Sequence, residues 1–283
     1  MADITGLSDT EKAVVDAFHQ LYYPFFRDTK WLGISAQKCP FDLFVYQELI
    51  FQLRPDLIIE CGTAEGGSAV FLASICELVG HGEIVTIDVQ PAGPSCPRVT
   101  YWEGGSLSHQ TISRVEELIT DKHSVMVILD DDHTRDHVLE ELRTYARFVT
   151  PGSYLVLEDT NINGHPVYPE FGPGPMEALS CFLKENNDFD VDRSREKFLV
   201  SFNPRGFLRK RGSTQPPVMN TLCGFLATDK DALIFSQKKQ LEKLERELAA
   251  RSAVFESVLN SKGWRLLNTL RTARSRFKTL VGR

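Results

Sequence analysis

The sequence of 283 residues lacks a long apolar run and has no paired cysteines. No hydrophobic stretch approaches the roughly 20 residues that cross a bilayer, and the first residues lack the basic-then-apolar pattern of a signal peptide. The six cysteines are scattered, without a C-x-x-C pair or metal-finger spacing, which indicates reduced and mostly buried thiols. We therefore expect a cytoplasmic protein.

Excess positive charge is also absent. The formal net charge is −6, which argues against nucleic-acid binding by the chain as a whole, so we expect no nucleic-acid partner. Residues 262–283 are the local exception, with seven Lys or Arg, no acid and apolar residues at helical spacing. Such a segment could lie on the inner face of an anionic membrane, or dock on its own domain or a partner subunit.

Strand-like and helix-like segments alternate through the middle of the chain. Strand patterns lie at residues 57–59, 83–88, 99–103, 124–129 and 153–157, and helical patterns at 8–21, 41–53, 68–79, 111–120, 135–148 and 175–186. This alternation predicts an α/β fold with a doubly wound, mostly parallel sheet. Two extended pieces, 189–191 and 197–202, are expected to pair as an antiparallel edge.

A glycine-rich turn follows the first buried strand and reads Glu60-Cys61-Gly62-Thr63-Ala64-Glu65-Gly66-Gly67. Its glycines let the backbone approach a ligand, and the helix that begins near Ser68 directs its N-terminal amides to the same place. The spacing differs from the G-x-G-x-x-G of dinucleotide sites. Glu60 and Glu65 would repel a pyrophosphate but attract the sulfonium and ammonium groups of S-adenosylmethionine (SAM). An ordinary strand-to-helix turn is the alternative.

Two further strand ends extend this nucleoside site. Asp88 ends the second strand, where an acid can accept both ribose hydroxyls of a nucleoside. Ser106 follows the third strand and is expected at the adenine edge, although an ordinary loop would read the same. The candidate SAM-binding residues are Glu60, Gly62, Thr63, Gly66, Ser68, Asp88, Ser106 and Asp130.

Acidic residues follow the fourth and fifth strands, as Asp130-Asp131-Asp132-His133 and Glu158-Asp159. Neighbouring strands would bring Asp130, Glu158 and Asp159 into one pocket, where their mutual repulsion needs a cation. Oxygen ligands suit Mg²⁺ or another hard divalent ion, so we predict a metal at these three residues. For Asp131 and Asp132, capping of the next helix is the alternative.

His133 is the candidate general base. An imidazole has an ordinary pKa of about 6.5 and can accept a proton near neutral pH. A bound metal would lower the pKa of a substrate hydroxyl toward the same range, so that the proton could be transferred. His137, one helical turn further on, and His165 are alternatives for this role.

Several segments between residues 31 and 209 resemble the cephalosporin hydroxylase / rhamnosyl O-methyltransferase family. The matching segments are Trp31–Gly33, Lys38–Pro40, Ile59–Thr63, Asp132–Val138, Tyr154–Asn161, Asn163–Val167 and Phe171–Met176. The resemblance implies a class I methyltransferase fold, SAM as donor and a Mg²⁺ site. It also places Asp130, Glu158 and Asp159 at ligand positions and His133 at the base position, which an aspartate takes in other relatives, so Asp132 is a second catalytic candidate.

We therefore expect a SAM- and metal-dependent O-methyltransferase that acts on a sugar hydroxyl of a glycan or a glycosylated natural product. A hydroxylated small molecule such as a cephalosporin-type β-lactam is the alternative acceptor. A non-catalytic SAM-binding accessory protein is an alternative of a different class.

The chain is expected to divide into four regions and to form a homo-oligomer. Residues 1–54 would be a helical cap over the substrate, and residues 55–204 the SAM-binding methyltransferase core. Residues 205–230, with glycines, prolines and basic residues, would be a loop or linker with room for an edge strand. Residues 231–283 would be a helical, basic amphipathic extension.

Overall fold

The computed structural model describes residues 6–212. The chain separates into two units, Met1–Val218 and Met219–Arg283, and all of the described residues belong to the first. Our predictions for the rest of the linker and for the helical extension, including the membrane-facing segment 262–283, lie outside the described residues. Among the residues that are described, no helix is both long and apolar enough to cross a membrane.

A seven-stranded sheet forms the centre of the described unit, with the strand order β5-β4-β3-β6-β7-β9-β8. Its strands are β3 (Leu57–Cys61), β4 (Glu83–Asp88), β5 (Val99–Glu103), β6 (Val125–Leu129), β7 (Tyr154–Leu157), β8 (Phe189–Val191) and β9 (Phe207–Lys210). The first five run parallel, and β9 runs antiparallel to both β7 and β8. The predicted α/β fold with a mostly parallel sheet and an antiparallel edge is confirmed.

The partner of β8 differs from our prediction. Residues 197–202 do not form a strand, and β8 pairs instead with Phe207–Lys210, which lies in the segment that we had assigned to a loop or linker with room for an edge strand. The apolar residues of 197–202 pack against the N-terminal segment instead of a strand. Phe202 is 1% exposed and stacks on His19. The backbone N–H of Phe202 donates to Asp42 at 2.8 Å, so this segment is held by the N-terminal helices rather than by a sheet.

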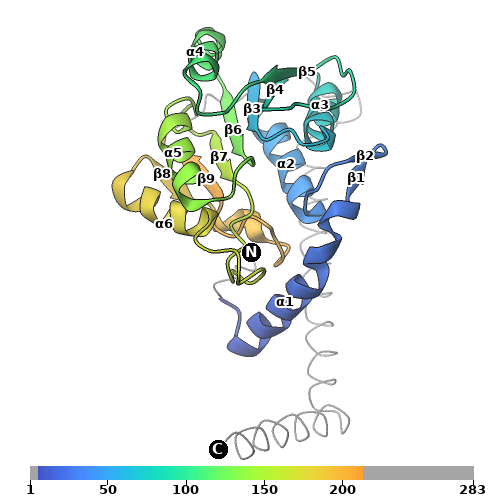
Figure 1. Cartoon of the computed structure of the whole chain (residues 1–283), viewed down its shortest axis with the longest axis vertical. Coiled ribbons are helices and arrows are strands. Elements are labelled where there is room, and N and C mark those ends of the chain that lie inside the picture. The colour runs from blue at the N-terminus through green and yellow to red at the C-terminus, as the bar shows by residue number, and fades with distance from the viewer. Residues whose placement is uncertain (1–5, 213–283) are drawn as a thin grey trace, which may run out of the picture. The chain divides into compact units, whose positions relative to one another are not determined.

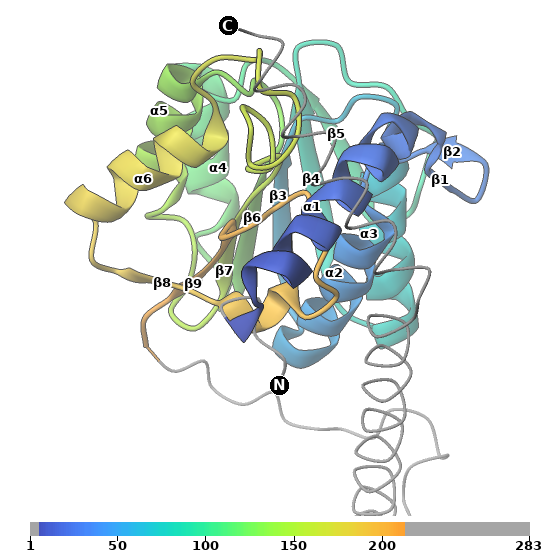
Figure 2. The ribbon, with the colours of Figure 1, turned by 90° about the horizontal axis from the view of Figure 1, so that it is seen from below.

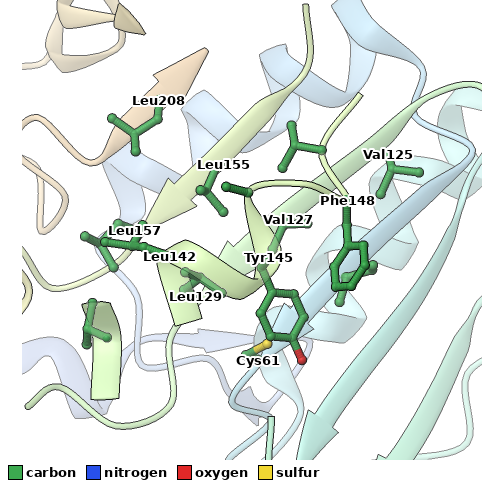
Figure 3. Close-up of a cluster of buried hydrophobic side chains, with 14 of the residues drawn as sticks. Cys61, Val125, Val127, Leu129, Leu142, Tyr145, Phe148, Leu155, Leu157 and Leu208 are labelled. Carbon is green, nitrogen blue, oxygen red and sulfur yellow. The ribbon is translucent and has the colours of Figure 1, made fainter. Parts of the chain in front are cut away.

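Helices cover both faces of the sheet (Figure 1). α2 (Pro40–Leu53) and α3 (Gly67–Val79) lie on one side, and α4 (His109–Leu118), α5 (Arg135–Tyr145) and α6 (Pro175–Glu185) lie on the other, as Figure 2 shows. Each side has its own apolar core. In the core beneath α5, the ring of Tyr145 lies beside Cys61 at the end of β3 (Figure 3). The strands are buried on both faces, which explains their nearly continuous hydrophobic sequences.

The N-terminal segment contacts Asn161, Pro166 and Phe202 through its helix and α3 through its hairpin. It contains α1 (Asp9–Tyr22), capped by Ser8 and Glu11, then the 3₁₀ helix η2 (Tyr23–Asp28) and a hairpin of β1 (Lys30–Trp31) and β2 (Ile34–Ser35). Trp31 packs edge-on against Phe71 of α3, with ring centroids 4.9 Å apart, and donates to Ser74 at 3.1 Å. The hairpin is therefore fixed to α3 through one tryptophan.

The turn after β3 requires glycine at position 62. Gly62 has φ +94°, and a Cβ there would overlap the carbonyl oxygen of Asp130. Gly62→Ala is expected to lower the free energy of unfolding by about 2–4 kcal/mol, because strain and overlap add. Gly105→Ala is the matched control, since a Cβ at Gly105 meets no atom within 4 Å. Urea denaturation of both variants tests this prediction, and equal stabilities would contradict it.

Candidate active site

A pocket of about 490 Å³ opens where the carboxyl ends of β3 and β6 meet. Its walls come from η2, from residues 35–37 after the hairpin, from the turns after β3 and β6, and from residues between 159 and 171. Six of the residues that we predicted from the sequence line it together: Gly62, Thr63, Ser68, Asp130, His133 and Asp159. The pocket therefore joins the expected SAM-binding turn to the expected metal and base.

Asp88 fixes the shape of the glycine turn. Its Oδ2 accepts the backbone N–H groups of Thr63 at 2.9 Å and Ala64 at 3.1 Å. Burial alone would raise the pKa of Asp88, but the N–H groups of Gln90, Thr63 and Ala64 outweigh burial and lower it. Asp88 is thus a charged acceptor beside the turn, and its contact with ribose hydroxyls stays a prediction.

Three other predicted SAM-binding residues lie near the turn but do not line the pocket. Glu60 is fully buried, accepts the hydroxyl of Thr86 at 2.7 Å, and has a second oxygen without a hydrogen-bond partner. Gly66 has φ +80° and is the N-cap residue of α3. Ser106 is buried and donates to Asp131 at 2.8 Å. Their contacts with SAM stay predictions.

Asp130, His133 and Asp159 converge on one point of the pocket. Nε2 of His133 lies 3.1 Å from Asp159 and 3.4 Å from Asp130. Burial disfavours a charged imidazole, but the two carboxylates outweigh burial and raise the pKa of His133 well above its ordinary value. His133 therefore carries a proton between two carboxylates as long as nothing else offsets their charge.

Lys38 is the neighbour that our sequence analysis did not place in the site. It is 3% exposed, bonds Asp130, and lies 3.2 Å from Glu158. Burial disfavours its charge, but Asp130 and Glu158 outweigh burial and raise the pKa of Lys38. The side chain is a permanent cation inside the group of acids.

Glu158 does not line the pocket and is held by two buried side chains. It is 2% exposed and accepts the hydroxyl of Tyr46 in addition to the Lys38 contact. Burial, offset in part by Lys38, raises the pKa of Glu158 to about 8. For Asp130, burial acts in the same direction, but Lys38 and His133 outweigh it and lower the pKa. Asp130 is consequently the ionised member of the pair.

The residues present fit a divalent cation. One donor atom each from Asp130, His133 and Asp159 lies within 4.8 Å of the others. Nε2 of His133 is buried and, within the part of the chain that the structure describes, makes no hydrogen bond of good geometry, so this nitrogen is unsatisfied. Carboxylate oxygens are the ligands that Mg²⁺ prefers. Asp130 and Asp159 therefore suit the predicted metal, whereas Glu158 as third ligand stays a prediction.

The other candidates for proton transfer lie in separate places. Asp132 accepts the backbone N–H of Thr134 at 2.7 Å, just before α5, and does not line the pocket. His137 contacts Asp131 at 3.1 Å. His165 contacts Glu177 at 2.8 Å, away from the acids that surround His133. Of these residues, only His133 lines the pocket, and its role as base stays a prediction.

Two aromatic pairs line the pocket, and our sequence analysis missed them. Tyr23 and Phe26 of η2 have ring centroids 5.3 Å apart, and Tyr168 and Phe171 have theirs 5.8 Å apart. A signal was present in the sequence, because Tyr-Pro-x-Phe is spelled at both places, 23–26 and 168–171. The repeated motif therefore supplies four aromatic rings to the wall of the pocket that also contains Asp130 and Asp159.

Comparison with known proteins places the chain in a family. The profile described as Rhamnosyl O-methyltransferase/CmcI matches residues 24–211. Rhamnosyl O-methyltransferases of Mycobacterium tuberculosis and Mycobacterium leprae are 38% and 34% identical, over 69% and 70% of this chain and 84% and 91% of theirs. A CmcI structure with Mg and SAM has a TM-score of 0.50 and 20% identity, over 66% of this chain and 78% of its own, which shows a common fold. The chain therefore belongs to the Rhamnosyl O-methyltransferase/CmcI family and is an O-methyltransferase.

Proposed function

We propose that this O-methyltransferase transfers the methyl group of SAM to a hydroxyl of a sugar, with the help of Mg²⁺. The observation that carries the proposal is the pocket itself, in which the glycine turn at Gly62 and Thr63 faces the convergent group of Asp130, His133 and Asp159. The names of the mycobacterial relatives, rhamnosyl O-methyltransferases, support a sugar as acceptor. The homo-oligomer and the membrane contact expected from the sequence stay predictions.

The charged side chains of the pocket have different roles in the proposed reaction. A bound divalent ion would lower the pKa of a coordinated sugar hydroxyl and offset the charge of Asp130 and Asp159. His133 holds its proton because these carboxylates raise its pKa, so offsetting their charge would free Nε2 to take the hydroxyl proton. Lys38 keeps Asp130 aimed at the pocket.

The aromatic pairs suit the acceptor side. A sugar presents flat C–H faces between its hydroxyls, and the rings of Tyr23, Phe26, Tyr168 and Phe171 offer apolar surface to such faces. They would also exclude water from the transferring methyl group. Holding hydroxyl and sulfonium in line then supplies much of the rate.

Removal of divalent metal tests the proposal. Treatment with EDTA is expected to reduce methyl transfer to a rhamnosylated acceptor by about 100-fold or more, and added Mg²⁺ is expected to restore it. Transfer of radiolabelled methyl from SAM measures both. Unchanged transfer after chelation would refute the metal, and turnover on a hydroxylated cephalosporin but on no sugar would favour the β-lactam alternative. Binding of SAM without turnover on either acceptor would favour the accessory protein.

A further inference from the structure

A second group of side chains converges outside the proposed mechanism. It contains Asp131, which follows β6, together with His137 and Glu141, which lie one turn apart on α5. One donor atom from each residue lies within 4.8 Å of the other two. Asp131 touches the pocket, but His137 and Glu141 do not line it. The methyl-transfer chemistry gives no reason for this arrangement.

Glu141 is the unusual member of the group. It is 1% exposed, and within residues 6–212 neither of its buried carboxylate oxygens accepts a hydrogen bond of good geometry. Its Oε1 points to the group, 3.7 Å from Nε2 of His137. A buried carboxylate is costly unless donors or a metal ion satisfy it. The nearby side chains of His137 and Ser106 offset the cost of burying the Glu141 carboxylate only in part, and a bound cation would satisfy its oxygens.

The distances in the group agree with a set of metal ligands. Nε2 of His137 lies 3.1 Å from Asp131 Oδ1 and 3.7 Å from Glu141 Oε1. Ligand atoms placed tetrahedrally around Zn²⁺ lie about 3.4 Å apart, because each metal–ligand bond is about 2.1 Å. The other oxygen of Asp131 accepts the hydroxyl of Ser106 at 2.8 Å, while Oδ1 accepts the backbone N–H of Asp132 and also faces His137. Outer hydrogen bonds of this kind orient ligating carboxylates in known metal sites.

We propose that Asp131, His137 and Glu141 form a second metal site, which binds a divalent transition-metal ion of the Zn²⁺ class. One imidazole and two carboxylates suit such an ion, whereas Mg²⁺ takes oxygen ligands almost alone. The side chains of Asp131 and His137 are 22% and 29% exposed, so the ion can enter from solvent and keep water as a fourth ligand. The ion fastens α5 to the turn after β6, directly beside Asp130.

Binding of Zn²⁺ to the full chain tests the site. The experiment uses chelator-treated protein carrying Asp130→Asn, so that the first group of ligands is weakened, and an excess of Mg²⁺ in the buffer. Calorimetry is expected to show about one Zn²⁺ bound per chain. His137→Ala or Glu141→Gln in the same background is expected to weaken that binding by at least about tenfold.

A matched control separates the site from adventitious histidine binding. His81 pairs with Asp56 at 2.8 Å and lies outside the group, so His81→Ala is expected to leave Zn²⁺ affinity unchanged. The proposal is overturned if the parent protein binds no Zn²⁺, or if His137→Ala binds it as tightly as His81→Ala does. Should Glu141→Gln fail to fold, His137→Ala decides alone, because its side chain is part-exposed and its loss opens no deep cavity. The readout is metal binding, so the result is independent of the proposed sugar methylation.

Discussion

Replacing Asp130 by asparagine is expected to lower the rate of methyl transfer by at least about 100-fold. Loss of a residue that only orients a metal ligand lowers affinity or activity by about 10–100-fold, and Asp130 is itself a proposed ligand. Asparagine keeps the shape of the side chain but removes the charge that faces Lys38, His133 and the pocket. SAM affinity is expected to change little, because the glycine turn at Gly62 is untouched. Steady-state rates with a sugar acceptor and calorimetry with SAM measure the two effects separately.

Asp136→Asn is the matched control for this prediction. Asp136 lies in the first turn of α5 close to the site in sequence, but its side chain is 83% exposed and pairs with the neighbouring Arg135. We expect its rate to stay within about twofold of wild type, as for most surface changes. Similar rates in the two variants would show that the acid after β6 has no part in the reaction.

Replacing Lys38 by methionine is expected to lower the free energy of unfolding by about 3–5 kcal/mol near neutral pH, because it leaves buried acids without their cation. Lys38 is 3% exposed and contacts both Asp130 and Glu158. Without it, the folded-state pKa values of these acids rise, so the folded state binds protons more tightly than the unfolded chain. Stability is then lost as pH rises, and the deficit against wild type should be larger at about pH 8 than at about pH 5.

Lys12→Met gives the comparison that this experiment needs. Lys12 pairs with Asp16 at 2.5 Å on α1, but its side chain is 63% exposed. Exposed pairs of this kind contribute less than about 1 kcal/mol, and we expect no strong dependence on pH. Urea denaturation of both variants at the two pH values is the measurement. If the Lys38 variant unfolds at the same urea concentration as the Lys12 variant at both pH values, the buried cation is not needed for stability.

The sheet and the place of the site could be predicted from sequence because their signals are local. Buried strands read as short apolar runs, and parallel strands bring their carboxyl ends to one edge, so Gly62, Asp130 and Asp159 could be grouped without knowledge of the fold. The structure places all three in one pocket. The periodicity of α1 and α2 was equally visible, and these helices begin within one residue of the predicted positions.

What could not be predicted depends on contacts between distant segments. Lys38 and Asp130 are 92 residues apart, and no periodicity relates them. Segment 197–202 and β9 both contain apolar residues, and which one joins the sheet depends on whether Phe202 packs better against α1 and η2 than against β8. Either segment would bury apolar side chains by joining the sheet, so the local sequence does not determine which one pairs with β8.

Lys38 also alters how the first 54 residues should be regarded. We had expected a cover for the substrate, which suggests a part that could be exchanged to change the acceptor. The ammonium group that contacts Asp130 and Glu158 comes from this part, so the two regions share one charged centre. Exchange of N-terminal regions between relatives would then preserve the enzyme only where the incoming segment brings its own lysine to the same carboxylates.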